Sequence, residues 1–131
     1  MIGLDTNVLL RLFVEDDPQQ NDRARRFFDA VSARETCVVN PVVLAEFAWT
    51  LVRGFRKKRR DVAHLIAEVL SADDVEISHR SAAESALAAY RNGKADFPDY
   101  FLAAINAELG CVSTATFDRD ALDYPAFSPV P

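Results

Sequence analysis

The sequence has few of the features that several common protein classes require. Its 131 residues contain no apolar run close to the roughly 20 that a membrane-spanning helix needs, so we expect no membrane segment. The start of the chain carries an acid at Asp5 in place of the basic stretch of a secretory signal, and we therefore expect a cytoplasmic protein. The two cysteines, Cys37 and Cys111, cannot build a cysteine-type zinc site, and their apolar neighbours predict buried free thiols.

Signatures of other chemistries are also missing. There is no glycine-rich phosphate loop, and no serine, cysteine or histidine stands in a setting typical of a nucleophile. The formal net charge of −5 makes the whole protein a poor electrostatic match for a polyanion. A polyanionic substrate would therefore require bound metal ions and a local basic patch.

A regular alternation of strands and helices is present. Half of the residues are hydrophobic, which is enough for one folded domain over residues 1–131. Short apolar runs predict strands at residues 2–4, 36–40, 75–77 and 112–116, with a short edge strand near Phe127. Helical spacing predicts helices directly after Asp5 and at residues 18–33, 42–55, 62–70 (capped by Asp61), 81–91 and about 97–109. This order predicts an α/β fold in which helices cover both faces of a parallel sheet.

At four places an acidic residue lies just past a strand or in the first turns of the helix after it. Asp5 ends the first strand, and Glu46 lies six residues after the second. Asp96 and Asp99 open a helix, and Asp118 follows the fourth strand. Because the carboxyl ends of parallel strands share one edge of a sheet, we expect these side chains to converge there. Converging carboxylates repel one another unless cations bind, and oxygen-only ligands suit Mg²⁺ or Mn²⁺.

Helix capping is the alternative explanation for some of these acids. Asp5 or Thr6 could cap the helix that follows. Asp96 and Asp99 have the spacing of a capping box, and a carboxylate there is also favoured by the helix dipole. We expect Asp99 to be a ligand and Asp96 to be either a cap or a second ligand.

These motifs, in this order, resemble the PIN-domain nucleases and most closely the VapC toxins of bacterial toxin–antitoxin pairs. The resemblance spans nearly the whole chain and rests on Gly3 to Leu10, Leu44 to Glu46, Ala95 to Asp99, Leu102 to Ala104, Gly110 to Val112 and Thr116 to Asp120. It implies a single PIN-like nuclease domain, folded as a three-layer α/β/α sandwich with a central parallel sheet.

The resemblance also implies an activity, a cofactor and partners. The chain would be a Mg²⁺- or Mn²⁺-dependent endoribonuclease whose catalytic acids are Asp5, Glu46, Asp99 and Asp118. The same acids would bind the metal together with Asp96, and supporting polar groups would be Thr6, Asn7, Thr116 and Asp120. A metal-activated water would attack the RNA phosphodiester and leave a 5′-phosphate and a 3′-hydroxyl. A small antitoxin of the VapB type would hold a homodimer inactive.

Basic residues concentrate in one stretch, residues 53–60, which we call the basic segment. Six of the fifteen basic residues lie in these eight positions: Arg53, Arg56, Lys57, Lys58, Arg59 and Arg60. Adjacent like charges repel one another, and a helix C-terminus accounts for only one or two of them. We interpret the basic segment as a contact for RNA phosphates, with an acidic stretch of the antitoxin as the alternative.

Two other classes of protein share parts of this pattern. A phosphoaspartate-type phosphatase places an aspartate after a strand, but position 7 holds Asn7 and not the second aspartate that it would use. A receiver domain would need a pair of N-terminal acids and a lysine after a late strand. A non-catalytic α/β binding module, with the acids as helix caps, is the remaining alternative, and metal-dependent RNA cleavage would separate it from a nuclease.

Overall fold

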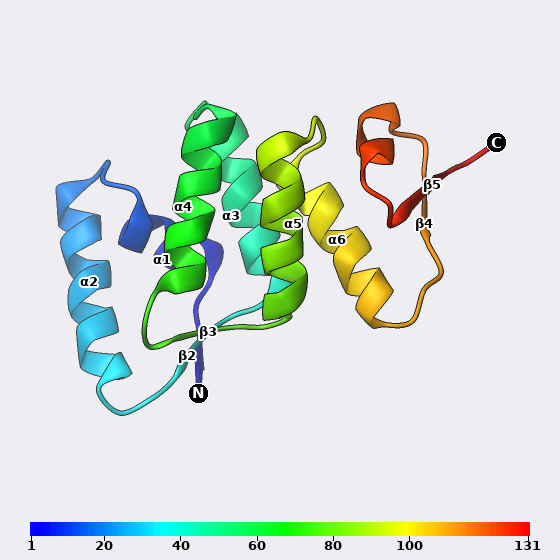
Figure 1. Ribbon diagram of the computed structural model, residues 1–131. Coiled ribbons are helices and arrows are strands. Elements are labelled where there is room, and N and C mark those ends of the chain that lie inside the picture. The colour runs from blue at the N-terminus through cyan, green and yellow to red at the C-terminus, as the bar shows by residue number, and fades with distance from the viewer.

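The computed structural model describes all 131 residues and contains a three-stranded parallel sheet (Figure 1). Its strands are β1 (Ile2–Gly3), β2 (Cys37–Val39) and β3 (Val75–Ile77), in the order β1-β2-β3. The register pairs Ile2 with Cys37 and Cys37 with Val75. Helices connect the strands, so the predicted parallel arrangement is confirmed.

Polar side chains fix where the first three helices begin. The helices are α1 (Thr6–Phe13), α2 (Pro18–Ser32) and α3 (Pro41–Arg53). Each follows a residue whose side chain accepts a hydrogen bond from the backbone of the first turn, namely Asp5, Asp17 and Asn40. A proline opens α2 and α3, where its missing N–H is not needed.

The later helices agree with the sequence except at one start. They are α4 (Arg59–Ser71), α5 (Arg80–Asn92) and α6 (Phe97–Glu108), and Gly110, with φ of 96°, follows the end of α6 as predicted. The prediction that Asp61 caps α4 is wrong, because the helix begins earlier, with Lys58 at the N-cap. The apolar pattern missed this turn since its residues are basic, and arginine has a good helix propensity.

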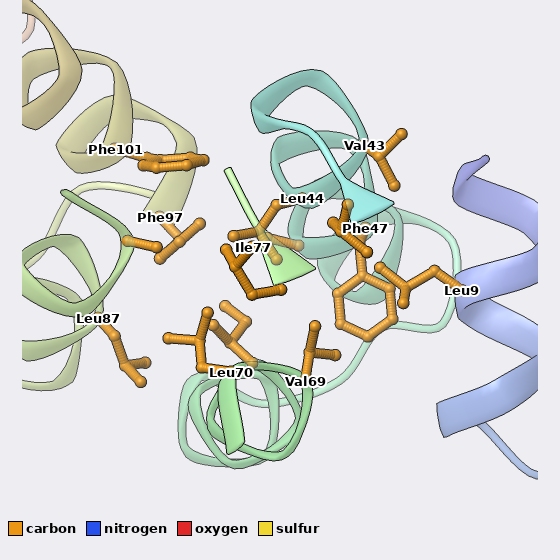
Figure 2. Close-up of a cluster of buried hydrophobic side chains, with 14 of the residues drawn as sticks. Leu9, Val43, Leu44, Phe47, Val69, Leu70, Ile77, Leu87, Phe97 and Phe101 are labelled. Atoms are coloured by element: carbon orange, nitrogen blue, oxygen red, sulfur yellow. The ribbon is translucent and has the colours of Figure 1, made fainter. Parts of the chain in front are cut away.

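The hydrophobic core lies where the sheet and the helices meet. Figure 2 shows side chains from six elements packed together there, among them Leu9, Phe47, Val69, Ile77, Leu87 and Phe97. Each of these side chains is at least nine-tenths buried, which makes the core the main source of stability. None of the helices combines the length and the apolar character needed to cross a membrane.

The C-terminal strands form a second sheet. β4 (Thr114–Thr116) pairs in parallel with β5 (Phe127–Pro129), and the 3₁₀ helix η1 (Arg119–Asp123) lies between them in sequence. In Figure 1, α6 separates this pair from β1–β3. The sequence had led us to expect the fourth strand in the same sheet as the first three. That expectation is wrong, because β4 pairs only with β5. The residues of β4 carry too little apolar surface to require burial in the main sheet. Cys111, which precedes β4, is exposed, so the prediction of a buried thiol is confirmed for Cys37 and wrong for Cys111.

Candidate acidic active site

The first part of the candidate site lies at the carboxyl end of β1. The Oδ1 atom of Asp5 accepts a 2.9 Å hydrogen bond from the backbone N–H of Val8, so the capping interpretation of Asp5 is confirmed. The next residue, Thr6, donates from Oγ1 to Oε1 of Glu46 at 2.9 Å. Both acids are exposed, and each uses only one oxygen in these bonds, which leaves the other carboxylate oxygen for a ligand.

The second part lies where α6 begins. Asp96 precedes the helix and Asp99 lies in its first turn. The side chain of Asp96 makes no capping hydrogen bond, so the predicted capping box does not form. Asp118 follows β4, where its N–H donates to Oγ1 of Thr116 at 2.9 Å and its Oδ1 accepts from the N–H of Asp120 at 3.0 Å.

The carboxylates crowd most closely around Asp99. Burial raises the pKa of Asp99 above its usual value, and the negative charges of Asp118 and Asp96 raise it further. A hydrogen bond with the backbone of Asp96 offsets part of this rise. The structure thus brings three of the predicted acids into one cluster at the start of α6.

No basic side chain neutralises the candidate acids. The ion pairs of the protein involve other carboxylates, such as Asp16 with Arg11 at 2.6 Å. Unpaired carboxylates fit a divalent cation by their donor chemistry, because Mg²⁺ and Mn²⁺ favour oxygen ligands. The electrostatic condition for a cation site is therefore met.

The acids form two clusters in the structure. Asp5 and Glu46 make one, and Asp96, Asp99 and Asp118 make the other. The helices that carry the two clusters pack against one another, because α3, which carries Glu46, contacts both α1 and α6. No three histidine, cysteine or acidic side chains lie close enough together to hold one ion, so the convergence of all five acids stays a prediction.

The predicted supporting residues differ in what they contact. Thr6, Thr116 and Asp120 each bond to one of the acidic residues. Asn7 is exposed and instead lines a cleft of about 430 Å³ between α1 and α2, together with Arg23 and Phe27. Its predicted role near the acids therefore has no contact to support it.

The basic segment contains one residue with an internal role. Arg59 donates from Nε to the carbonyl oxygen of Tyr90 at 2.7 Å and from its terminal nitrogens to the carbonyls of Lys94 and Ala95. Its guanidinium also lies 4.0 Å from the centre of the Tyr90 ring. These contacts correct the view of Arg59 as a free surface charge. The cations left for a partner are Arg56, Lys57, Lys58 and Arg60, together with Arg53, whose guanidinium lies 5.5 Å from the centre of the exposed Trp49 ring.

Two residues beside the site were missing from the sequence-based prediction. Tyr100 is fully buried in α6, and its hydroxyl donates to the carboxylate of Asp123 at 2.9 Å. The available signal was a tyrosine in the apolar stretch from Tyr100 to Ile105, because a buried hydroxyl needs a hydrogen-bond partner. Nothing in the sequence indicated that Asp123 would be that partner.

Comparison with known proteins gives one match. The model of the PIN domain family matches residues 2–127, which include every acid of the two clusters. No curated protein matches the chain.

Proposed function

Because the chain belongs to the PIN domain family, whose members are generally metal-dependent nucleases, we propose that it is an endoribonuclease that hydrolyses RNA with Mg²⁺ or Mn²⁺. The observation that carries this proposal is the crowding of Asp96 and Asp118 around Asp99 without a basic partner. Holding like charges together costs free energy, and a bound divalent cation offsets that cost. Because the protein has a net charge of −5, it repels the anionic RNA backbone, and a bound cation would offset this repulsion at the active site.

In this proposal the acids of both clusters are ligands of one cation. Asp5, Glu46, Asp99 and Asp118 would hold the cation, with Asp96 as a further ligand. The cation supplies charge stabilisation at the phosphate oxygens and makes an attacking water more acidic.

The neighbouring residues restrict the acids before the substrate arrives. Thr6 orients Glu46 through its hydroxyl, and Thr116 orders the backbone at Asp118. Asp99, whose pKa is raised, takes up a proton more readily than an ordinary aspartate and releases it when a cation binds. Ordering of this kind lowers the entropy cost of assembling the site around the substrate.

RNA cleavage by the purified protein tests the proposal. The parent should cleave RNA with Mn²⁺, leave 5′-phosphate ends and stop when EDTA is added. Asp5→Asn should lower the rate by more than about 100-fold, the upper end of losses seen for residues that only support a metal ligand. The matched control Asp29→Asn, an exposed acid on α2, should keep the parent rate. Full activity in Asp5→Asn would remove Asp5 from the mechanism, and a parent without metal-dependent cleavage would favour the non-catalytic binding module.

We further propose that this nuclease is the toxin of a toxin–antitoxin pair, acts in the cytoplasm as a homodimer and is held inactive by a small antitoxin of the VapB type. Exposed apolar side chains on α3 support a helical partner. Val42 is 66% exposed and Trp49 53%, and two turns of helix place them on one face. An amphipathic helix can bind such a face, and a basic side chain at its end would inhibit by occupying the carboxylates.

Co-expression with a small protein encoded next to this gene tests the partner proposal. The purified complex should cleave no RNA, and the free nuclease should have the mass of a dimer by light scattering. Trp49→Ala should weaken the complex, whereas Phe27→Ala, an exposed aromatic on α2, is the matched control. Undiminished cleavage by the saturated complex would contradict inhibition, and a monomeric mass would contradict the homodimer.

A further inference from the structure

The hydroxyl of Tyr100 joins two segments that each carry acids of the candidate site. It accepts hydrogen bonds from the backbone N–H groups of Lys94 at 3.1 Å and Ala95 at 3.2 Å. It donates to the carboxylate of Asp123, with oxygen distances of 2.9 and 3.2 Å. A tyrosine hydroxyl has one proton and limited acceptor capacity, so its hydrogen-bonding capacity is fully used.

Both bonded segments lie next to candidate ligands. Ala95 directly precedes Asp96, and Tyr100 itself directly follows Asp99. On the other side, Asp123 ends η1, the short helix whose N-cap is Asp118. One buried oxygen atom thus connects the start of α6 to the segment that carries Asp118.

The segment before Asp96 is also held from its carbonyl side. Arg59 binds the carbonyl oxygens of Tyr90 and Ala95, while Tyr100 binds the N–H groups of Lys94 and Ala95. The backbone at Ala95 is therefore bonded through both of its polar groups. Backbone held this way has little freedom to move the carboxylate of Asp96.

Gly93 allows Tyr100 to reach this position. A Cβ atom at Gly93 would lie 1.9 Å from the Tyr100 hydroxyl oxygen and 2.8 Å from the carbonyl of Ala89. The φ of Gly93 is −97°, which any residue can adopt. The glycine is therefore required by close approach of the hydroxyl and not by backbone conformation.

From these contacts we propose that Tyr100 is a positioning residue for the metal site, which sets the placement of Asp118 relative to Asp96 and Asp99. The proposal rests on the proposed metal-dependent nuclease function. Removing the hydroxyl leaves two N–H groups without a partner and breaks the bond from α6 to the end of η1. The carboxylates then lose part of their relative placement, while the aromatic ring keeps its packing against Tyr124. Residues that orient metal ligands in this way typically contribute 10- to 100-fold to metal affinity.

Calorimetric titration with Mn²⁺ tests the proposal independently of activity. Tyr100→Phe should bind Mn²⁺ about 10-fold more weakly than the parent and should need correspondingly more Mn²⁺ for half-maximal RNA cleavage, while the rate at saturating Mn²⁺ stays close to that of the parent. The control is Tyr90→Phe, which removes the hydroxyl of another buried tyrosine and leaves intact the backbone carbonyl of Tyr90 that Arg59 binds. It should leave the Mn²⁺ affinity unchanged.

A second variant separates positioning from a general loss of stability. Asp123 is exposed, so Asp123→Ala leaves no cavity in the core, yet it removes the same link to η1. Asp123→Ala should lower Mn²⁺ affinity, and adding it to Tyr100→Phe should cause little further loss. If the parent binds Mn²⁺ and cleaves RNA but both single variants keep its Mn²⁺ affinity, the positioning role is overturned and the proposed function stands. A parent that neither binds Mn²⁺ nor cleaves RNA would instead overturn the proposed function itself.

Discussion

The two parallel sheets of this protein are held in place by different interactions. In the sheet β1–β3, Cys37 and Val39 are completely buried and belong to the hydrophobic core. The pair β4–β5 contains no buried residue. Ala121 of η1 anchors its surroundings in the core, and hydrogen bonds fix them further, from Tyr100 to Asp123 and between the hydroxyls of Ser85 and Tyr124 at 2.7 Å.

The two acidic clusters therefore have unequal structural supports. Asp5 follows β1, whose own residues are exposed but which pairs with the buried strand β2, whereas Asp118 follows β4, which pairs only with β5. A fully buried large side chain contributes roughly 1.5–3 kcal/mol, and a typical hydrogen bond about 1 kcal/mol. We therefore expect global stability to depend on the first sheet, and the placement of Asp118 to depend on a few polar contacts.

The largest expected effect is on stability and compares the two sheets directly. Phe47→Ala empties a fully buried position in the core beside β1–β3 and should cost about 3–5 kcal/mol. Phe127→Ala in β5 removes a ring that is only partly buried and should cost at most about 1–2 kcal/mol. Urea unfolding measures both, and equal losses would show that the C-terminal sheet shares the core's stability.

Two glycine substitutions compare the close packing around Tyr100 with the open surroundings of β1. Gly93→Ala should displace the Tyr100 hydroxyl, cost about 1–3 kcal/mol by overpacking and weaken Mn²⁺ binding. Gly3→Ala in β1 is the matched control, because no atom lies within 4 Å of its added methyl group. If Gly93→Ala unfolded at the same urea concentration as the parent and bound Mn²⁺ equally well, the close approach of Tyr100 would have no energetic weight.

The pH dependence of stability reports on the second cluster. The folded-state pKa of Asp99 is raised, so the metal-free native state binds this proton more tightly than the unfolded chain does. Its contribution to stability is therefore lost as pH rises through the raised pKa. In EDTA, Asp99→Asn should melt above the parent at pH 7, and the difference should vanish near pH 3, where the unfolded aspartate is also largely protonated. A metal-free Asp99→Asn that melts below the parent at pH 7 would argue against carboxylate crowding, and Asp29→Asn serves as the control.

The smallest expected effect concerns RNA binding outside both clusters. Neutralising three free cations of the basic segment (Arg56→Gln, Lys57→Gln, Arg60→Gln) should weaken RNA binding and flatten its salt dependence by up to roughly 0.7 in log–log slope for each phosphate that is no longer neutralised. Cleavage of bound RNA should change little, because the acids are untouched. The same loss of charge on α2 and after it (Arg23→Gln, Arg26→Gln, Arg34→Gln) is the control. An unchanged salt slope together with loss of the antitoxin would assign the basic segment to the protein partner.

Much of the fold could be predicted because local signals and global packing agree. Pro41 opens α3, and the apolar run at Val75 to Ile77 is a strand, as expected. Asn40, predicted to end the second strand, is instead the N-cap of α3. The separate β4–β5 sheet could not be predicted, since strand pairing is a long-range property and residues 114–116 look the same to local reasoning in either sheet.

The candidate site was predictable at the level of residue types and not at the level of contacts. The position of Asp99 at a helix start and of Asp118 after a strand identified both acids, and the charge of Asp118 raises the pKa of Asp99. The internal role of Arg59 was hidden, because a charged run gives no sign that one member bonds backbone carbonyls. The Tyr100–Asp123 bond spans 23 residues and depends on tertiary structure alone.

The most direct test of the account is whether the two clusters bind the same cation. Calorimetric titration with Mn²⁺ should be carried out on the parent, Asp5→Asn and Asp118→Asn, with Asp29→Asn as the control. We predict that the parent and the control bind Mn²⁺ alike and that each of the other two variants loses binding, because both clusters supply ligands to one site. Binding by Asp118→Asn at the parent's affinity would contradict the claim, since the cation would then be held by the first cluster without the second.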